Sequence, residues 1–281
     1  MTRRQFLLGL AGGLATATTG AAYVSLIEPR WLAVSRIQVP RPPPANSSPI
    51  RILQLSDLHL SSVVPLDWIE ESVALGLAEK PDVIALTGDF YTGKAQQVDA
   101  YAKVLRRLSA AAPTFACLGN HDGGRWSEHR GGLVMIDAVR GMLANAGVTC
   151  LVNERRTLEV RGQRLAFFGV GDLWSAMCDP GTAFANAGPR MGEQRIVLSH
   201  NPDSKTMFKH FDWDVMLCGH THGGQVCLPF VGAPFAPVSD KRFLHGLYSW
   251  ENRWLHVTSG VGNLHGIRFN CRPEISVITL G

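Results

Sequence analysis

The sequence lacks several patterns that would assign it to a common class of protein. Its six cysteines form no C-x-x-C pair, which argues against a thiolate zinc site or a dithiol redox motif. It also contains no G-x-S-x-G nucleophile elbow, no P-loop and no internal repeat. None of these patterns therefore competes with a site built from other side chains.

Charge is also scarce. Charged residues make up 18% of the chain against 46% hydrophobic residues, which is typical of a packed globular protein. The formal net charge is +4, and it falls to about +2 when the first thirty residues, with three arginines and one glutamate, are left out. So small a charge indicates no nucleic-acid partner.

The cysteines divide into two groups. Cys117 and Cys218 stand at the ends of apolar runs, so we expect them to be small buried hydrophobic side chains. The other four could form disulfides in an oxidising compartment, and the sequence does not say which would pair. They are Cys150, Cys178, Cys227 and Cys271.

Residues 1–30 have the pattern of a secretory signal or a membrane anchor. Arg3 and Arg4 precede Phe6–Ile27, a stretch without charge that is rich in Gly, Ala and Thr. Adjacent arginines followed by x-Phe-Leu match the twin-arginine signal, although an ordinary signal is the alternative. We expect the twin-arginine machinery to export the chain, with this segment cleaved or kept as an anchor. The domain would be periplasmic or face outward, and residues 6–27 could associate with the membrane.

A proline-rich linker is expected at residues 31–49. The interval ends in QVPRPPPANSSP, whose five prolines and two serines disfavour a helix and favour extended chain. The folded domain should therefore occupy residues 50–281.

The first half of this domain predicts strands that alternate with helices. Short apolar runs indicate buried strands, and apolar residues at helical spacing indicate helices. The expected order is strand 51–55, helix 66–79, strand 82–86, helix 95–112, strand 114–118 and helix 133–146.

The second half is richer in strands. Residues 157–160 and 164–170 predict a hairpin, and further strands are expected at 195–198, 214–218, 246–250, 254–258 and 274–280. The two halves together predict an α/β fold, a four-layer α/β/β/α sandwich of two mixed sheets flanked by helices.

Polar clusters follow five of the predicted strands. They are Ser56–His59, Thr87–Asp89, Gly119–Asp122, Ser199–His200 and Gly219–Gln225. Ligands of α/β sheets gather at the carboxyl ends of strands, so these clusters can converge on one place.

The clusters contain metal-binding side chains. There are two carboxylates, four imidazoles and one amide, from Asp57, Asp89, His59, His200, His220, His222 and Asn120. Mixed nitrogen and oxygen ligands favour manganese, iron or zinc over calcium or magnesium. Asp57 and His59 stand two residues apart, as do His220 and His222, so each pair would point the same way in extended chain.

The blocks D-x-H, G-D, G-N-H-D, a lone H and G-H-x-H occur in this order. About 30 residues separate His59 from Asp89, and about 30 more lead to Asn120. Over residues 51–280 the blocks resemble the calcineurin-like metallophosphoesterase superfamily. With the arginine pair at the start, they make the chain similar to the bacterial phosphodiesterases that are exported by the twin-arginine route.

The resemblance implies a role for each residue of the blocks. One metal ion would be held by Asp57, His59 and His222, a second by Asn120, His200 and His220, and Asp89 would bridge the two. His121 would contact the phosphate and protonate or stabilise the leaving oxygen. Asp122 would hydrogen-bond His121 and keep its proton in place.

The implied activity is hydrolysis of a phosphate ester, most simply a phosphodiester. A hydroxide that bridges two divalent ions (Mn, Fe or Zn) would attack phosphorus in line. Outside the blocks, Arg268 could bind a substrate phosphate. Trp174 could stand on the rim of the cleft, although packing in the core is the favoured interpretation, and His265 is expected to be a surface or packed histidine.

Two alternatives stay open. Relatives in this branch with an N-terminal membrane segment hydrolyse UDP-2,3-diacylglucosamine in lipid A synthesis, and an acyl-sized apolar groove beside the metals would favour such a pyrophosphatase. The other alternative is a non-catalytic binding module on the same fold, against which the complete set of ligand positions argues.

Overall fold

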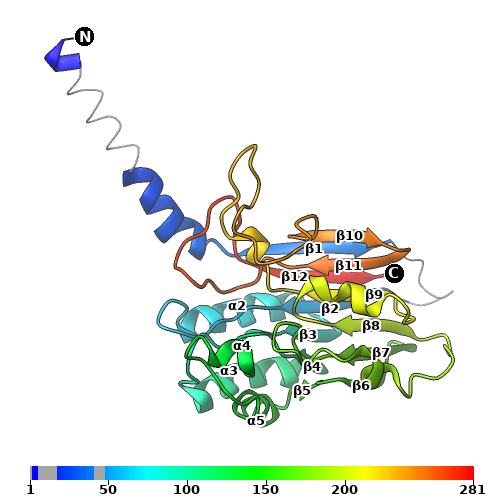
Figure 1. Ribbon diagram of the computed structural model, residues 1–281. Helices are drawn as coiled ribbons and strands as arrows, with labels where there is room; N and C mark the ends of the chain where they lie inside the picture. Colours follow the sequence, from blue (N-terminus) through cyan, green and yellow to red (C-terminus); the bar gives the residue numbers. More distant parts are fainter. Residues whose placement is uncertain (1, 6–17, 41–47) are drawn as a thin grey trace.

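The computed structural model describes residues 2–5, 18–40 and 48–281. Two six-stranded sheets lie face to face, and helices cover their outer faces (Figure 1). The layer between the sheets is apolar, with Ile52, Phe115, Phe167 and Leu217 among the side chains buried there. The expected four-layer α/β/β/α sandwich of two mixed sheets is confirmed.

The first sheet has the strand order β1-β12-β2-β3-β4-β5. These strands span Ala33–Val39, Glu274–Leu280, Ile50–Leu55, Val83–Thr87, Thr114–Cys117 and Thr149–Cys150. Strands β2 to β5 run parallel, while β12 is antiparallel to β2. Every residue of β3 and β4 is buried, as their apolar sequences predict for strands covered on both faces.

The second sheet has the order β10-β11-β9-β8-β7-β6. Its strands span Gly246–Trp250, Arg253–Val257, Val215–Cys218, Gln194–Leu198, Gln163–Gly169 and Glu154–Val160. Strands β6 and β7 form the predicted antiparallel hairpin, and β7, β8, β9 and β11 run parallel. The carboxyl ends of β8 and β9 can thus carry side chains to one edge of the sandwich.

Helices cover both outer faces. On the first sheet lie α2 (Leu66–Ala78), α3 (Val98–Ala111) and α5 (Asp137–Asn145), and on the second lie α6 (Pro180–Phe184) and the 3₁₀ helix η3 (Pro202–Phe208). Two shorter elements, α4 (Arg125–Glu128) and the 3₁₀ turn η4 (His222–Gly224), lie in the loops after β4 and β9. Helix α3 begins at residue 98 rather than 95, because the left-handed backbone of Gln97 (φ 51°) cannot continue a helix.

The folded domain begins earlier than the sequence predicts. Strand β1, at residues 33–39, pairs in parallel with β12 along its whole length, although these residues were assigned to a linker. Val34, Ile37 and Val39 suit a strand, and the pairing satisfies main-chain groups that a linker would leave to water. The prediction of a linker is therefore wrong for this part of residues 31–49, and residues 41–47 lie outside the described part of the chain.

The N-terminal segment reaches β1 through two helical turns, η1 (Tyr23–Ile27) and η2 (Glu28–Arg30), which project from the sandwich (Figure 1). No helix among the described residues combines the length and the apolar character needed to cross a bilayer. Residues 6–17, the first part of the uncharged stretch, lie outside the described residues.

A buried polar link joins the two sheets beneath one edge of the sandwich. The Gln54 side-chain amide of β2 donates to Thr87 Oγ1 at 3.0 Å and to the carbonyl of Cys218, at the end of β9, at 2.9 Å. Its Oε1 lies 2.8 Å from Nδ1 of His256, on β11. Because buried amides need partners, this link fixes the ends of β2, β3 and β9 relative to one another.

Candidate metal centre

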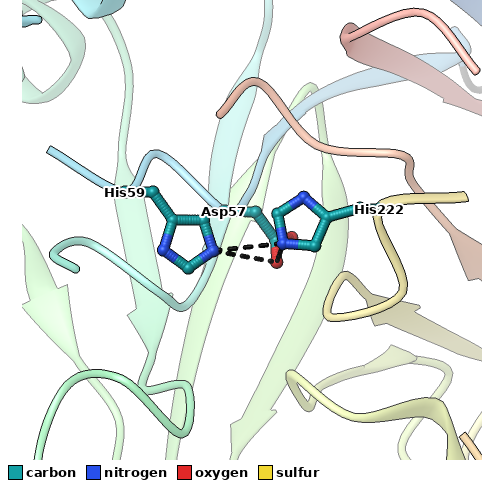
Figure 2. Close-up of side chains that lie close together, drawn as sticks. All are labelled: Asp57, His59 and His222. Atoms are coloured by element: carbon teal, nitrogen blue, oxygen red, sulfur yellow. Dashed lines mark hydrogen bonds and ion pairs between the residues drawn. The ribbon is translucent and has the colours of Figure 1, made fainter. Parts of the chain in front are cut away.

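Three side chains from the two sheets meet at the ends of β2 and β9. Figure 2 shows the rings of His59 and His222 beside the carboxylate of Asp57. The two Nε2 atoms lie 3.2 Å apart, and Asp57 Oδ1 lies 3.5 Å from His222 Nε2. All three side chains are buried. Three ligand atoms this close, turned toward one another, can share one cation.

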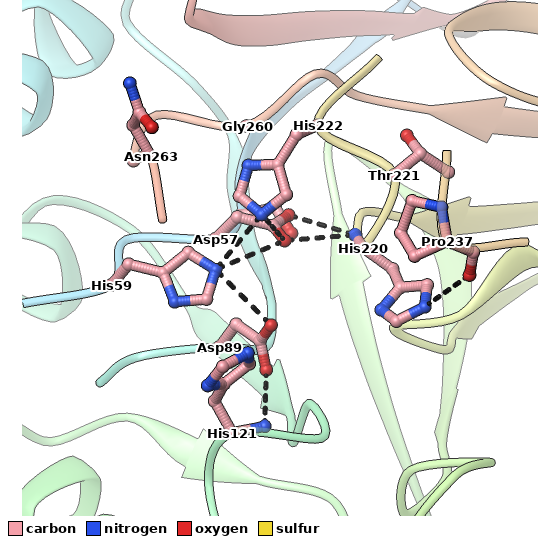
Figure 3. Close-up of polar contacts among 12 residues, drawn as sticks. Asp57, His59, Asp89, His121, His220, Thr221, His222, Pro237, Gly260 and Asn263 are labelled. Atoms are coloured by element: carbon pink, nitrogen blue, oxygen red, sulfur yellow. Dashed lines mark hydrogen bonds and ion pairs between the residues drawn. The ribbon is translucent and has the colours of Figure 1, made fainter. Parts of the chain in front are cut away.

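A second set lies next to the first. Asp89, after β3, meets His200, after β8, and His220, after β9, with ligand atoms again within 4.8 Å of one another. The Asp89 Oδ2 atom lies 3.1 Å from His200 Nε2 and 3.4 Å from Nε2 of His59, a member of the first set. One carboxylate therefore contacts both sets, and Figure 3 shows its contact with His59.

Asn120 supplies the test of whether this cluster suits a cation. Its amide oxygen is buried and has no hydrogen-bond partner among the described residues. An unpaired buried amide oxygen costs free energy unless something in the site binds it. A divalent cation would satisfy that oxygen, and mixed carboxylate, imidazole and amide donors suit one. The residues present therefore fit a divalent metal centre.

Hydrogen bonds orient three of the imidazoles. His200 Nδ1 lies 2.7 Å from the Thr87 carbonyl, so it donates there and leaves Nε2 free to bind a cation. His220 is turned the other way, because its Nε2 donates to the Pro237 carbonyl at 3.0 Å and leaves Nδ1 toward the site. His59 Nδ1 pairs with the Thr92 hydroxyl at 2.8 Å.

Burial keeps most of these rings neutral. It lowers the pKa of His59 and of His220 to about 3, and it lowers the pKa of His222 as well. Neutral imidazoles are the form that binds metal. His200 differs, since burial lowers its pKa but the charges of Asp89 and Asp57 outweigh this and raise the pKa to about 10. A cation among these carboxylates would compete with that proton for Nε2.

Asp57 and His59 do converge, but the backbone that brings them together is not the extended chain expected from the sequence. We expected Asp57 and His59 to point the same way because they stand two apart in extended chain. Both have left-handed backbone, with φ of 53° and 48°, and so do Asp89, His220 and His222. Non-glycine residues rarely adopt this conformation, and where they do it is often at functional sites. Successive left-handed turns, rather than strand alternation, aim the side chains.

Two glycines let the backbones pass close to the carboxylates. A Cβ atom at Gly219 would overlap a carboxylate oxygen of Asp57, and one at Gly119 would overlap Asp89. No residue with a side chain therefore fits at Gly219, before His220, or at Gly119, before Asn120, without moving the carboxylates.

His121 lies beside the ligands. Its ring packs edge-on against His59 with centroids 4.9 Å apart, and burial lowers its pKa. Asp122 has a different role from the one implied by the resemblance. Its two oxygens accept from the backbone N–H groups of Asp89, Phe90 and Gly119 at 2.7–2.8 Å, not from His121. It therefore holds the loops that carry Asp89 and Asn120.

Arg268 is not available to a substrate phosphate. Its side chain is fully buried, and the guanidinium donates to backbone carbonyls that include those of Ser259, Gly262 and Cys271. These bonds tie together the loop that passes behind Asp57 and His222. The prediction of substrate binding is wrong because the sequence does not reveal how deeply this arginine lies.

Aromatic side chains form the wall of the cleft above the ligands. Trp174 lies edge-on to His220 with centroids 4.3 Å apart, so the rim interpretation holds and the favoured core interpretation is wrong. Trp126, on α4, packs against His121 at 4.6 Å. Trp126 was not predicted from the sequence, where its only signal was its place five residues after His121. His265, expected elsewhere, also lines the cleft.

The cleft has a volume of about 420 Å³ and a mostly apolar wall. Besides the tryptophans, its lining includes Val226, Phe235, Leu264 and Ile267.

All six cysteines are free thiols, and Cys117 and Cys218 are buried as expected.

Comparison with known proteins now identifies the family. The model of the family described as calcineurin-like phosphoesterase matches residues 50–224, an interval that contains all seven candidate ligands. The chain belongs to the calcineurin-like phosphoesterase family. Because it belongs to this family and buries clusters of metal-binding side chains, this calcineurin-like phosphoesterase is a metal-dependent phosphoester hydrolase.

Similar proteins within the family match along most of the chain. Phosphodiesterase YaeI of Escherichia coli (strain K12) is 41% identical, and the match covers 100% of this chain and 99% of YaeI. The uncharacterized metallophosphoesterase YkuE of Bacillus subtilis is 29% identical, with 100% and 98% covered. UDP-2,3-diacylglucosamine pyrophosphatase LpxG of Chlamydia trachomatis is 27% identical, with 90% of each chain covered.

Proposed function

We propose that the protein is a phosphodiesterase with a binuclear divalent metal centre. The observation that carries this proposal is the Asp89 carboxylate, which faces both ligand sets. Asp57, His59 and His222 would hold one ion, and Asn120, His200 and His220 the other. The similarity to the relative named phosphodiesterase YaeI supports a diester rather than a monoester as substrate.

When bound, two divalent ions would activate a water molecule and neutralise charge on the phosphoryl oxygens. Residues of the chain itself orient the metal ligands and line the cleft. The Thr87 and Pro237 carbonyls hold His200 and His220 in the ligating tautomer. Trp126 and Trp174 form part of the apolar wall of the cleft. His121, which lines the cleft beside the ligands, would donate a proton from its ring to the departing oxygen.

The test is hydrolysis by the metal-loaded full chain. With Mn²⁺, the protein should cleave bis(p-nitrophenyl) phosphate faster than p-nitrophenyl phosphate, and a chelator should abolish the activity. Asp89→Asn should lower the rate by at least about 100-fold, because it removes the charge shared by both sets. Asp99→Asn, on the exposed face of α3, is the matched control. An unchanged rate in Asp89→Asn, or no hydrolysis by any metal-loaded form, would reject the proposal, and the latter would favour a non-catalytic binding module.

The apolar cleft favours one second candidate. Val226, Phe235, Leu264 and Ile267 line the space beside the ligands, where an acyl or other lipid group could lie. A nucleotide-lipid pyrophosphatase, such as the relative named UDP-2,3-diacylglucosamine pyrophosphatase LpxG, would use such a groove. A substrate screen that includes nucleotide-sugar lipids separates the two, since a preference of 100-fold for the lipid over the aryl diester would select the second candidate.

We also propose that the chain is exported by the twin-arginine route and works in the periplasm or facing outward from the membrane. Arg3 and Arg4, followed by Phe6-Leu7, support this route. Replacing both arginines with lysine should leave the protein in the cytoplasm, as measured by cell fractionation. Replacing Arg106 and Arg107 of α3 in the same way is the control. Export that continues without the arginine pair would reject the route.

A further inference from the structure

An apolar tip projects from the loop after η4. We define the apolar tip as residues 228–235, with the sequence LPFVGAPF. The side chain of Phe230 is fully exposed, and Val231 and Phe235 are 68% and 76% exposed. Large apolar side chains that cluster on an exposed surface indicate a site of contact with a membrane or another protein.

The tip is held in a defined shape. Leu228 and Gly232 exchange two backbone hydrogen bonds, of 2.8 and 2.9 Å, which close a tight turn beneath Phe230 and Val231. At its base, the Lys241 ammonium donates to the Pro234 carbonyl at 2.8 Å. A turn closed in this way presents its two apolar side chains outward at low entropic cost.

The N-terminal segment enters the domain next to this tip. The Val24 carbonyl accepts from the backbone N–H of Arg268 at 2.9 Å, and the neighbouring residue Phe269 accepts from Cys227, just before the tip. Figure 1 shows the N-terminal helical segment and the tip loop projecting from the same end of the sandwich. In sequence, the uncharged residues 6–27 run directly into this point.

The surroundings of the tip have the chemistry of a membrane interface. Trp31 is half exposed, and the Arg272 guanidinium lies over its ring, 4.1 Å from the centroid. Lys241 and Arg242 lie exposed at the base of the tip, and the Arg242 guanidinium pairs with the Asp240 carboxylate at 2.8 Å. Tryptophan and basic side chains around an apolar group are typical of segments at the level of lipid head groups.

The tip also continues into the cleft. Phe235, at its end, lines the cleft together with Ile267 and Trp174, on the way to His220 and His222. Phe235 is thus the residue at which the apolar tip meets the mostly apolar wall of the cleft.

We propose that the apolar tip docks into the interface of a lipid bilayer and places the mouth of the cleft against the membrane, where the enzyme takes amphiphilic phosphate esters. The occupant is a bilayer rather than a second copy of the chain, because Phe230 and Val231 stand out from a narrow turn instead of forming a flat face. Residues 18–27, the described part of the uncharged N-terminal stretch, project from the same end of the sandwich and would meet the same bilayer.

Docking is tested in the full chain with a local probe. Phe230→Trp is mixed with vesicles of phosphatidylcholine and phosphatidylglycerol whose acyl chains carry bromine, a contact quencher of tryptophan. The emission of the new tryptophan is the difference between the variant and wild type. When vesicles are added, this emission should shift to shorter wavelength and fall at least about twofold. Met191→Trp is the control, since Met191 is also largely exposed (72%) and lies in the loop between α6 and β8.

Three outcomes would overturn docking. The tryptophan at position 230 could stay unquenched while the protein still sediments with vesicles, so that the N-terminal segment alone makes the contact. Both tryptophans could be quenched alike, which would indicate non-specific adsorption. The tryptophan at 230 could also shift to the blue without vesicles as protein concentration rises, in which case a second copy covers the tip.

The delivery of substrate rests on the proposed phosphodiesterase activity and has its own test. Phe230→Asp combined with Val231→Asp should lower the hydrolysis of a phosphodiester lipid held in vesicles about tenfold. The rate on soluble bis(p-nitrophenyl) phosphate should stay within twofold of wild type. Equal lipid rates for variant and wild type would reject delivery by the tip. If wild type fails on the soluble diester too, the proposed function itself is rejected.

Discussion

His121 is the one histidine of the five blocks that belongs to neither proposed ligand set, although its ring nitrogen lies within 4.8 Å of ligand atoms of His59 and Asp89. Its ring is held between His59 and Trp126, and its backbone N–H donates to Asp89 Oδ1 at 2.9 Å. The residue is thus tied to the shared carboxylate through its main chain, while its ring faces the cleft. This placement suits proton transfer to a group that leaves phosphorus.

Loss of this imidazole should depend on the leaving group. His121→Ala should lower kcat about 10²–10⁴-fold for a diester with an alkyl leaving group, which needs a proton. The loss should be much smaller for p-nitrophenolate, which departs without one. Metal content, measured by mass spectrometry, should be unchanged.

His129→Ala provides the control for this variant, because His129 is exposed and its ring pairs with the Arg125 carbonyl of its own turn. If His121→Ala loses metal, His121 is a ligand instead. If both leaving groups suffer equally, it is not the proton donor.

The ligands could be predicted from the sequence because each is a chemically distinctive residue beside a predicted strand end. How they converge could not be predicted, since the left-handed backbone at Asp57 and His222 depends on tertiary contacts. The same limit explains Arg268 and Asp122. Arginine and aspartate are both common in phosphate-binding and catalytic sites. Only the fold shows that these two side chains are already hydrogen-bonded to backbone groups.

At the scale of elements, periodicity predicted the three long helices and most strands of the sandwich, but it missed the short helices α6 and η3 and the edge strands β1 and β5. Strand β1 was missed because it precedes a run of prolines and adds at the edge of the sheet, on β12. Two-residue β5 is too short to leave a pattern. Pairing between distant segments, such as β1 with β12, has no local signal.

Glu274, the first residue of β12, joins several of these elements. Its carboxylate accepts from the Thr258 hydroxyl and the Ser259 N–H, both at 2.9 Å, and from Ser35 of β1. His245 Nε2 lies 3.0 Å away. Burial acts to raise the pKa of Glu274, but the bonds from His245 and Ser35 outweigh it and lower the pKa to about 2.

Stability should therefore depend on pH through Glu274. A carboxyl with a lowered pKa in the folded state stabilises it fully above the unfolded value, 4.5, and this contribution is lost as pH falls toward 2. Glu274→Gln should lower the free energy of unfolding by about 3 kcal/mol at pH 7 and by less than half of that at pH 3.

Urea unfolding of chelator-treated protein at the two pH values measures this difference. The exposed Glu251→Gln, whose partner Lys209 lies 3.3 Å away on the surface, should change stability at neither pH. A loss in Glu274→Gln that is equal at pH 7 and pH 3 would contradict the linkage.

For the whole molecule, the candidate centre is where the two sheets meet. Asp57 and Asp89 follow strands of the first sheet, and His200 and His220 follow strands of the second. Bound cations would cross-link the sheets at one edge, above the Gln54 link.

Metal should accordingly stabilise the whole sandwich. At a concentration about 100 times its dissociation constant, a divalent ion should raise Tm by roughly 5–10 °C in calorimetry. Asp89→Asn should lose most of this increase, while Asp99→Asn should keep it. A Tm that does not respond to Mn²⁺ or Zn²⁺ would mean that cations do not bind the folded cluster.

The most direct measurement is anomalous X-ray diffraction from crystals of the full chain grown with Mn²⁺. We expect two anomalous peaks in the cleft, one contacting Asp57, His59 and His222, and the other contacting Asn120, His200 and His220. The Asp89 carboxylate should lie between them. A single peak, or none within reach of Asp89, would contradict the binuclear centre.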